Sequence, residues 1–296
     1  MSKMLDQKEV NHYAQASRAD SLVAERDVVL THVLRVLAEQ QLLPSLAFKG
    51  GTCMKKIYFG KTGRFSMDLD FTSTKIDRAK FKLQLISLLH NKKYYGISFQ
   101  INDEWDSGNS YGAVISYSHD WNSDKFEIEV SFREKPILPV VELSILDEVY
   151  FRYCGFDPFE VPCLQKVEVL AEKIRASFQR TKARDLFDLY LFATTPGSYD
   201  TRKVKALAVI KCWNSKDPFD PNRLMAKISE GKYDWNDLQR LVRPNMLASP
   251  EKIIRTVLNR YKFLTNLDGD LVRIVADSKS HRDRSFVVGL AHQLVK

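Results

Sequence analysis

Residues 48 to 71, FKGGTCMKKIYFGKTGRFSMDLDF, constrain the fold of this chain more than any other stretch. From Phe65 to Phe71 apolar and polar residues alternate, which predicts a half-buried strand with Ser66, Asp68 and Asp70 on its polar side. Carboxylates two residues apart on a strand lie roughly 6.6 Å apart and repel each other unless a cation binds between them. The stretch therefore predicts a strand that binds a divalent metal, and a pair of solvated surface acids is the open alternative.

Two adjacent glycines precede this strand and predict a turn that can hold a phosphate group. They follow a short predicted strand, residues 45 to 49, and precede a helix that we expect to begin at an N-cap, Thr52, and to end near Gly60. Glycine has no Cβ to obstruct a phosphate, and the first N–H groups of a helix can donate to one. The candidate nucleotide-binding residues are Gly50, Gly51, Thr52, Arg64 and Ser66, and nearby positive charge is expected from Lys49, Lys55, Lys56 and Arg64.

Two of these assignments have plain alternatives. Gly50 and Gly51 can form an ordinary tight turn, and Ser66 can be an ordinary strand serine rather than one that binds a phosphate or becomes modified. The order of strand, glycine turn, helix and acid-bearing strand within about 25 residues favours the functional interpretation over these alternatives.

Beyond this stretch the sequence predicts an α+β chain in two parts. Apolar residues at helical spacing predict a core helix at 21–43 and another helix at 77–91, and β-forming residues dominate from 96 to 132. After residue 160 the strand signal fades, and helices are expected at 164–194, 201–213, 236–243 and 250–266. We therefore expect a mixed α/β domain, residues 1–160, and a mainly helical domain, residues 161–296, that completes the active-site cleft.

Composition narrows the class of protein and of partner. The chain has 296 residues, with 45 lysines and arginines against 37 acidic residues, and this excess makes a polyanionic partner plausible. Its 4 cysteines form no C-x-x-C pair, which argues against a zinc site and a disulfide scaffold. No run of about 18 apolar residues and no secretion signal is evident, so we expect a cytoplasmic protein.

A second candidate site is predicted in the helical half. Asp188 lies within the apolar run DLFDLYLF, so a helix there cannot leave its carboxylate freely solvated, and a buried carboxylate needs a partner. Lys173 is the candidate partner, because it flanks the apolar stripe of its own predicted helix. Asp185, one turn before Asp188, ranks lower because Arg184 or Lys182 can neutralise it. A purely structural ion pair between two helices is the open alternative.

The order of these motifs resembles that of a known family. G-G-T, then S-x-D-x-D, then a later acid-bearing strand at residues 125–132, is similar to the nucleotidyltransferase fold of DNA polymerase β-like enzymes. Together with VEVLAEKIRAS (167–177) and RTKARDLFDLYLF (180–192), KGGT…RFSMDLDF more closely resembles AbiEii/AbiGii-type (MenT-like) nucleotidyltransferase toxins of type IV toxin–antitoxin systems. The resemblance covers roughly residues 46–192, and it implies a polymerase β-like core of mixed sheet and flanking helices with a mainly helical C-terminal lobe.

The resemblance also implies roles for individual residues. The implied catalytic residues are Asp68, Asp70, Lys173 and Asp188, and the implied ligands of Mg²⁺, or of Mn²⁺, are Asp68, Asp70 and Glu129. Glu129 is preferred over Glu127 because IEVS, residues 128 to 131, matches the family pattern. The implied reaction transfers a nucleotide from an NTP to an RNA acceptor, foremost a tRNA 3′ end, and blocks translation. A cognate antitoxin, an AbiEi-like regulator, is the implied protein partner.

Two other functions stay open on sequence grounds. One is nucleotide transfer to a protein hydroxyl or a small molecule, and the other is non-catalytic binding of nucleotides or RNA. The 6 histidines and 4 tryptophans, Trp105 among them, are scattered without ligand-like spacing, and the sequence assigns none of them to chemistry.

Overall fold

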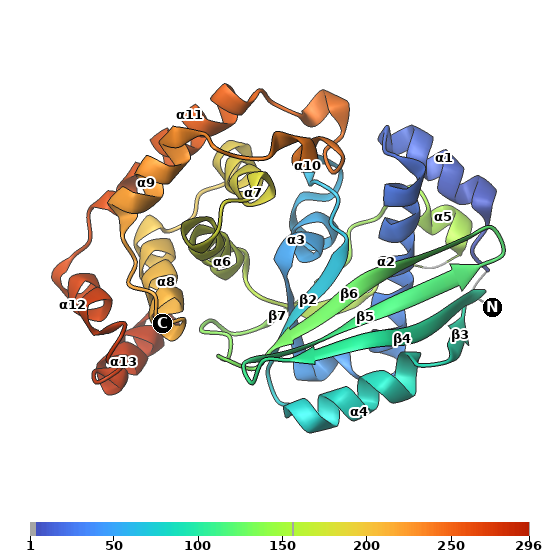
Figure 1. Ribbon diagram of the computed structural model, residues 1–296, viewed down its shortest axis with the longest axis horizontal. Helices are drawn as coiled ribbons and strands as arrows, with labels where there is room; N and C mark the ends of the chain where they lie inside the picture. Colours follow the sequence, from blue (N-terminus) through green and yellow to red (C-terminus); the bar gives the residue numbers. More distant parts are fainter. Residues whose placement is uncertain (1–3, 156, 296) are drawn as a thin grey trace. The chain divides into compact units, whose positions relative to one another are not determined.

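The computed structural model describes residues 4–155 and 157–295, and the chain divides into two compact units (Figure 1). Within the described residues, the first unit extends to Pro136 and also contains Val140–Leu164 and Arg240–Asn245. The second unit contains Ile137–Pro139, Gln165–Gln239 and the chain from Met246 onward. No helix of the described chain is both long enough and apolar enough to cross a membrane.

The first unit is built on an eight-stranded mixed sheet with the strand order β3-β4-β5-β6-β2-β1-β8-β7. The strands are β1 (Leu46–Lys49), β2 (Asp68–Ser73), β3 (Lys92–Tyr94), β4 (Ile97–Asp106), β5 (Ser110–His119), β6 (Asn122–Ser131), β7 (Val141–Ser144) and β8 (Glu160–Cys163). β2 lies antiparallel to β1 and parallel to β6, so the two acid-bearing strands are direct neighbours. The predicted β-rich region is confirmed as the hairpins of β4, β5 and β6.

Helices α2 (Ser21–Glu39) and α4 (Arg78–Leu89) pack on the apolar face of this sheet, and three further helices of the described chain belong to the first unit. These are α1 (Gln7–Ser17), α3 (Gly50–Cys53) and α5 (Phe151–Cys154), with 3-10 turns at η1 (Leu43–Ser45) and η3 (Gly60–Thr62). The Phe81 ring of α4 meets Tyr111 of β5 edge-on at 5.9 Å, and Tyr117 of β5 donates to Glu25 of α2 at 3.1 Å. Because side chains alternate along a strand, Gly112 and its neighbours on that face point away from these helices.

The predicted core helix at 21–43 and the helix at 77–91 are confirmed as α2 and α4, each shorter than expected. α2 ends at Glu39, and the chain then turns before Pro44 enters a 3-10 turn, because proline is excluded from a helix interior. The predicted strand from Phe65 to Phe71 begins three residues late, at Asp68, and continues to Ser73.

The glycine turn leads directly into a helix, so the predicted N-cap at Thr52 is wrong. α3 begins at Gly50 with Lys49 as the N-cap, and it continues as a π-helix, η2 (Met54–Phe59), that ends at Gly60. Gly50 has a φ of +79°, a conformation that side-chain-bearing residues rarely adopt. That conformation, rather than a side-chain cap, reverses the chain from β1 into the helix.

Two buried lysines fix this helix against α2. Lys55 Nζ lies 3.0 Å from Asp27 Oδ2 and 2.9 Å from Glu148 Oε1. Lys56 Nζ lies 3.0 Å from Asp27 Oδ1 and 2.6 Å from the hydroxyl of Thr31. Burial would raise the pKa of Asp27, but the charges of both lysines outweigh burial and hold that pKa well below its usual value. Paired charges therefore hold the helix after the glycine turn in place. Removing one partner would leave a buried charge without compensation.

The second unit is helical, in line with the expected helices after residue 164. Its helices are α6 (Lys166–Gln179), α7 (Ala183–Thr194), α8 (Thr201–Asn214), α9 (Pro221–Glu230), α10 (Trp235–Gln239), α11 (Pro250–Arg260), α12 (Gly269–Asp277) and α13 (Arg284–Val295), with the 3-10 turn η5 (Lys262–Thr265); the 3-10 turn η4 (Pro244–Met246) spans the boundary between the units. Glu168 of α6 is buried and accepts the N–H groups of Ile137 and Leu138 at 2.9 Å each. Lys211 of α8 balances its charge, with Nζ 2.9 Å from Glu168 Oε1.

Asp27→Asn should lower the free energy of unfolding by about 3–5 kcal/mol, because it leaves two buried lysines with a single carboxylate partner in the described chain, Glu148. Urea unfolding at neutral pH measures this loss. In the wild type, the lowered pKa of Asp27 contributes stability above about pH 4 that is lost as the pH falls. The free energy of unfolding of the variant should therefore fall less steeply as the pH is lowered than that of the wild type.

The matched control is Asp106→Asn, which breaks the ion pair between Asp106 Oδ1 and Arg78 Nη1 at 2.9 Å, where both side chains are about half exposed. An exposed pair contributes only about 0–1 kcal/mol. Equal losses in the two variants would contradict the structural role of the buried network.

Candidate active site

Strand pairing places four carboxylates on one face of the sheet. Asp70 is the register partner of Glu129, and Asp68 is the partner of Glu127. Register partners in neighbouring strands project to the same face, as do residues two apart along one strand. Asp68, Asp70 and Glu129 are half-buried, whereas Glu127 is exposed. The three predicted metal ligands thus share a face, and Glu129 is the more enclosed of the two glutamates.

The glycine turn touches this acidic row directly. A Cβ atom at Gly50 would lie 2.1 Å from Asp70 Oδ2, so a side chain at position 50 collides with the carboxylate. A Cβ atom at Gly51 would lie 2.7 Å from Ser66 Oγ and 2.8 Å from Arg64 Nη2. The structure therefore brings together Gly50, Gly51, Arg64, Ser66 and Asp70, all of which the sequence proposes for the site.

Thr52 and Arg64 stabilise this arrangement through the backbone. The Thr52 hydroxyl donates to the carbonyl oxygen of Asp68 at 2.5 Å, which ties α3 to the first residue of β2. Arg64 Nη1 donates to the carbonyl oxygen of Phe65 at 3.0 Å. Thr52, Arg64 and Ser66 are all buried, so the structure fixes their positions beside the glycines rather than leaving them free to rearrange.

The charge near the turn differs from the sequence expectation. Lys55 and Lys56 were expected beside the phosphate site, but both are buried and face Asp27 on α2. The prediction that they add positive charge beside the turn is wrong, because the helix that follows the turn directs these side chains into the interior. Two of the expected cations do lie at the turn: Arg64 packs on Gly51, and Lys49 is the N-cap residue of α3.

The acidic row provides a suitable donor set for a hard cation but not a complete cage. Among residues 4–155 and 157–295, no group of three or more His, Cys, Asp or Glu side chains is arranged to hold a metal ion. Mg²⁺ prefers carboxylate oxygens and is commonly held by one or two carboxylates together with substrate phosphates. The chemistry of Asp68 and Asp70 fits such an ion, and Glu129 as a third ligand stays a prediction.

In the second unit, the predicted ion pair is present. Lys173 Nζ lies 2.7 Å from Asp188 Oδ2 and 3.8 Å from Asp185 Oδ1, and all three residues are buried. The partner of Asp185 is Arg180, which donates through Nε at 2.7 Å and Nη2 at 3.0 Å, rather than the expected Arg184 or Lys182. Lys173 thus lies between two carboxylates, and an arginine neutralises one of them.

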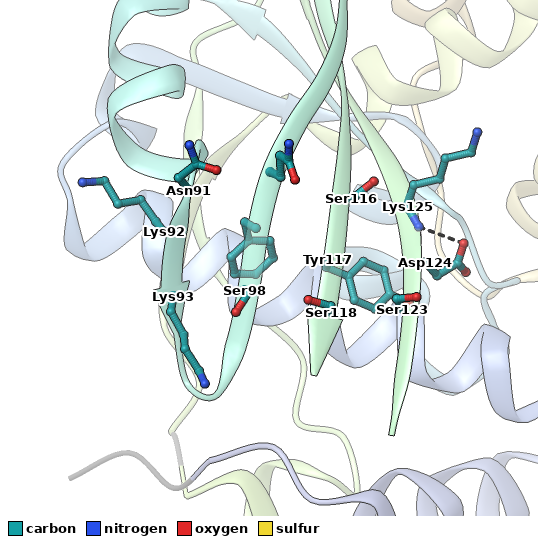
Figure 2. Close-up of a pocket in the computed structure, with 12 residues that line it drawn as sticks. Asn91, Lys92, Lys93, Ser98, Ser116, Tyr117, Ser118, Ser123, Asp124 and Lys125 are labelled. Atoms are coloured by element: carbon teal, nitrogen blue, oxygen red, sulfur yellow. Dashed lines mark hydrogen bonds between the residues drawn. The ribbon is translucent and has the colours of Figure 1, made fainter. Parts of the chain in front are cut away.

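A polar groove lies on the sheet away from the acidic row. It encloses about 700 Å³, and Figure 2 shows its lining of lysine, hydroxyl and amide side chains from β3 to β6. Strand register arranges part of the lining in two rows, Gln100–Ser116–Lys125 and Ser98–Ser118–Ser123. None of the residues that the sequence proposes for catalysis or nucleotide binding lines it.

The family model described as "Nucleotidyl transferase AbiEii toxin, Type IV TA system" matches residues 32–268. That match covers the glycine turn, both acid-bearing strands and the buried ion pair. The chain belongs to the AbiEii family. The predicted family is confirmed, and the coarse function follows: this is a member of a family of nucleotidyltransferase toxins from type IV toxin–antitoxin systems.

Solved structures agree with the AbiEii assignment. MenT4, a nucleotidyltransferase toxin from Mycobacterium tuberculosis H37Rv, is similar with a TM-score of 0.85 and 26% identity over 99% of each chain. JHP933 from Helicobacter pylori matches with a TM-score of 0.52 and 17% identity, over 90% of this chain and 99% of that one, and shows the fold alone. A comparison with curated proteins finds no match. The predicted fold class is confirmed.

Sequence reasoning missed two features of this AbiEii chain. Segment Arg240–Asn245 returns to the first unit, where the Leu241 carbonyl accepts the N–H of Phe65 at 2.7 Å, just before the acidic strand. Trp105 lies over Gly112, its register partner, because a Cβ atom at Gly112 would meet the indole at 2.1 Å. A glycine paired with a tryptophan on the neighbouring strand indicates the second feature. That pairing can be recognised only when the register of the two strands is known.

Gly50→Ala should remove the close approach of the turn to Asp70. We expect a loss of stability beyond the roughly 1–2 kcal/mol that a left-handed alanine costs, together with a roughly tenfold loss in NTP affinity, equivalent to one charge-assisted hydrogen bond. Thermal unfolding and calorimetric titration with a non-hydrolysable NTP measure the two effects.

Gly108→Ala is the control that separates the effect of backbone strain from the effect of a steric clash with a neighbouring side chain. Gly108 has a φ of +77°, close to that of Gly50, but the nearest atom to its added Cβ is 3.9 Å away. This control should lose stability through φ alone and keep its NTP affinity. If both alanine variants bind the NTP equally well, the contact between positions 50 and 70 has no part in the nucleotide site.

Proposed function

We propose that this AbiEii-family protein transfers a nucleotide from an NTP to an RNA acceptor, foremost a tRNA 3′ end, and so blocks translation. The observation that carries the proposal is the contact of Gly50 with Asp70, because it joins the proposed phosphate-binding turn to a proposed metal-binding carboxylate. A triphosphate and the cation that neutralises it must occupy adjacent places, and this turn and this carboxylate are adjacent. A simple surface turn needs no acidic neighbour.

The turn supplies the phosphate contacts. The first N–H groups of the helical segment from Gly50 to Phe59 have no partner within the helix, so those of Gly51 and Thr52 are suited to donate to β- and γ-phosphate oxygens. Arg64 adds a guanidinium, whose fork can donate two hydrogen bonds to a phosphate. Ser66, packed on Gly51, adds a hydroxyl donor.

The acidic row is the proposed site of the cation. Asp68 and Asp70, with Glu129 as the proposed third ligand, are the residues that would bind Mg²⁺, or Mn²⁺. When bound, such an ion offsets triphosphate charge and polarises the α-phosphate towards attack by a hydroxyl. The half-buried positions of these carboxylates restrict their rotamers, which keeps the donor oxygens on one face for the substrate to complete the coordination.

Lys173 has a proposed role in stabilising charge on the phosphates during transfer, and Asp188 is its positioning residue. A fixed ammonium is suited to this task because it needs little reorganisation when negative charge develops. Burial between Asp185 and Asp188 restricts Lys173 to one place. Lys173 Nζ lies between the two carboxylates, and Arg180 pairs with Asp185.

The proposals for the acceptor and for the protein partner are supported by the net charge of the chain and by its family. A formal net charge of +8 suits a polyanionic acceptor, because a basic protein gathers phosphates through counterion release. Membership of a type IV toxin–antitoxin family supports a cognate antitoxin protein, and an AbiEi-like regulator is the proposed partner. MenT4, similar over 99% of this chain, is itself described as a nucleotidyltransferase toxin.

Incubation of the purified chain with each α-³²P-labelled NTP and total tRNA should move label into tRNA in the presence of Mg²⁺. Glu129→Gln should lower the rate at least about tenfold, because a neutral amide oxygen binds a hard cation more weakly than a carboxylate does. Glu127→Gln, which changes the exposed neighbour on the same strand, should keep nearly wild-type rates. Denaturing gels and mass spectrometry of the tRNA measure the products.

Each other outcome selects another function. Label on a protein from an added extract, with none on RNA, favours transfer to a protein hydroxyl. RNA binding without transfer under any NTP favours a non-catalytic binding protein. Equal rates for Glu127→Gln and Glu129→Gln would remove Glu129 from the metal site.

A double-mutant cycle tests the Lys173 role. Lys173→Met and Asp188→Asn should each lower kcat, and the double variant should lose little more than the worse single variant, because residues acting as a unit are not additive. Lys211→Met, which breaks a different buried pair in the same unit, is the control and should cost stability with kcat preserved in the folded fraction. If all variants lose stability but keep kcat in the folded fraction, the pair of Lys173 and Asp188 has only a structural role.

A further inference from the structure

The sheet face that carries the acidic row continues into an aromatic surface. Strand register connects Lys49, Asp70, Glu129, Gly112 and Trp105 in one line across β1, β2, β6, β5 and β4. Partners in register project to the same face, so the indole of Trp105 and the carboxylate of Glu129 lie on the same side of the sheet. This is the face opposite to the one that α2 and α4 cover.

Gly112 lets the indole lie flat on the strand. An added Cβ there would lie 2.1 Å from Cζ2 and 2.2 Å from Cε2 of Trp105, so the ring rests on the backbone of Gly112 and leans toward β6. Trp105 is only partly buried. An indole supported on one side and accessible to solvent is suited to stacking with a second planar ring.

Reaction geometry gives this surface a place in the proposed chemistry. In-line displacement puts the attacking hydroxyl on the side of the α-phosphorus opposite to the leaving pyrophosphate. The phosphate turn at Gly50 and Gly51 lies on the β1 side of Asp70. The attacking hydroxyl therefore approaches from the β6 side, toward Glu129 and Gly112. Two strand spacings, roughly 10 Å, separate Asp70 from Gly112, a distance that one nucleotide spans.

We infer that Trp105 stacks on the terminal base of the RNA acceptor and thereby places its 3′-hydroxyl beside the acidic row. Trp105 is an acceptor-binding residue in this arrangement and takes no part in proton or phosphoryl transfer. The inference rests on the proposed function and deepens it, because it assigns the acceptor side of the site to residues of β4 and β5. Stacking tolerates any base, so sequence preference must come from other contacts.

The polar groove of Figure 2 extends the same path. Along β5 and β6, Ser116 and Lys125 share the face of Gly112 and Glu129, four residues further along each strand or roughly 13 Å away. Lys92, Lys93 and Lys125 line this groove together with serine hydroxyls. Ammonium and hydroxyl groups are the usual contacts for a ribose-phosphate backbone. The nucleotides that precede the acceptor's terminal base would follow this groove.

The test compares RNA binding with nucleotide binding. A fluorescein-labelled oligoribonucleotide with a single-stranded, 3′-deoxy end is titrated with wild type, Trp105→Leu and Trp105→Phe, and anisotropy gives the Kd. Leucine keeps apolar bulk without a stacking surface, and we expect it to weaken RNA binding about tenfold, within the range for loss of one stacked base. Phenylalanine should recover most of the affinity. All variants should bind a non-hydrolysable NTP as the wild type does.

Trp121→Phe is the matched control, because Trp121 lies in the turn between β5 and β6 and packs against the core, with its ring 3.9 Å from that of His119. It should bind RNA as tightly as the wild type. Lys125→Gln should weaken RNA binding and reduce its salt dependence, without affecting the NTP.

The outcomes separate this inference from the proposed function. If Trp105→Leu binds the RNA as tightly as wild type, or if it weakens NTP binding instead, the inference is overturned. Absence of RNA binding by the wild type overturns it as well. Because the oligonucleotide cannot react, a wild type that binds RNA through Trp105 but transfers no nucleotide to any RNA would refute the proposed reaction and still support the stacking role.

Discussion

The register of β2 between two neighbours controls the direction of every acidic group in the candidate site. β2 pairs antiparallel with β1 and parallel with β6, so Asp70 is fixed opposite both Lys49 and Glu129. A slip of one residue would turn both aspartates into the core and place Leu69 and Phe71 on the open face. Since Leu69 and Phe71 are fully buried, that slip would expose much of the core, and the apolar residues therefore fix the position of the acids.

The direction of positive charge follows from the same local structure. A helix that begins at Gly50 turns its sixth and seventh residues, Lys55 and Lys56, inward to Asp27, so their charge is used for stability. Positive charge at the turn then comes from Arg64, which packs on Gly51, and from Lys49, the N-cap residue of α3. Stability and the proposed phosphate binding thus depend on different cations within one short stretch of the chain. Replacing a cation that stabilises the fold need not affect phosphate binding, and the reverse also holds.

The sequence predicts this site well where chemistry is local and poorly where it depends on distant segments. Local sequence patterns indicated the environments of these residues directly: the alternation around Asp68 and Asp70, the glycine pair, and the apolar run around Asp188. The inward turn of Lys55 was not predictable, because its partners Asp27 and Glu148 lie 28 and 93 residues away in the chain. Arg180 as the partner of Asp185 was missed for a different reason: helix α7 begins after Arg180, so helical spacing did not apply. Trp105 required the register of β4 and β5, including its irregularity between Ile101 and Asp103.

The incomplete metal cage is consistent with the electrostatics of the site. Three carboxylates held permanently in contact would repel one another in the absence of a cation and would lower the stability of the sheet. Spreading Asp68, Asp70 and Glu129 over two strands limits that repulsion while keeping their oxygens on one face. A nucleotide that brings its own phosphate ligands can then complete the coordination, so cation and triphosphate binding should be mutually dependent. The glycine that touches Asp70 couples the two binding events, because it leaves no space between the phosphate turn and the acid.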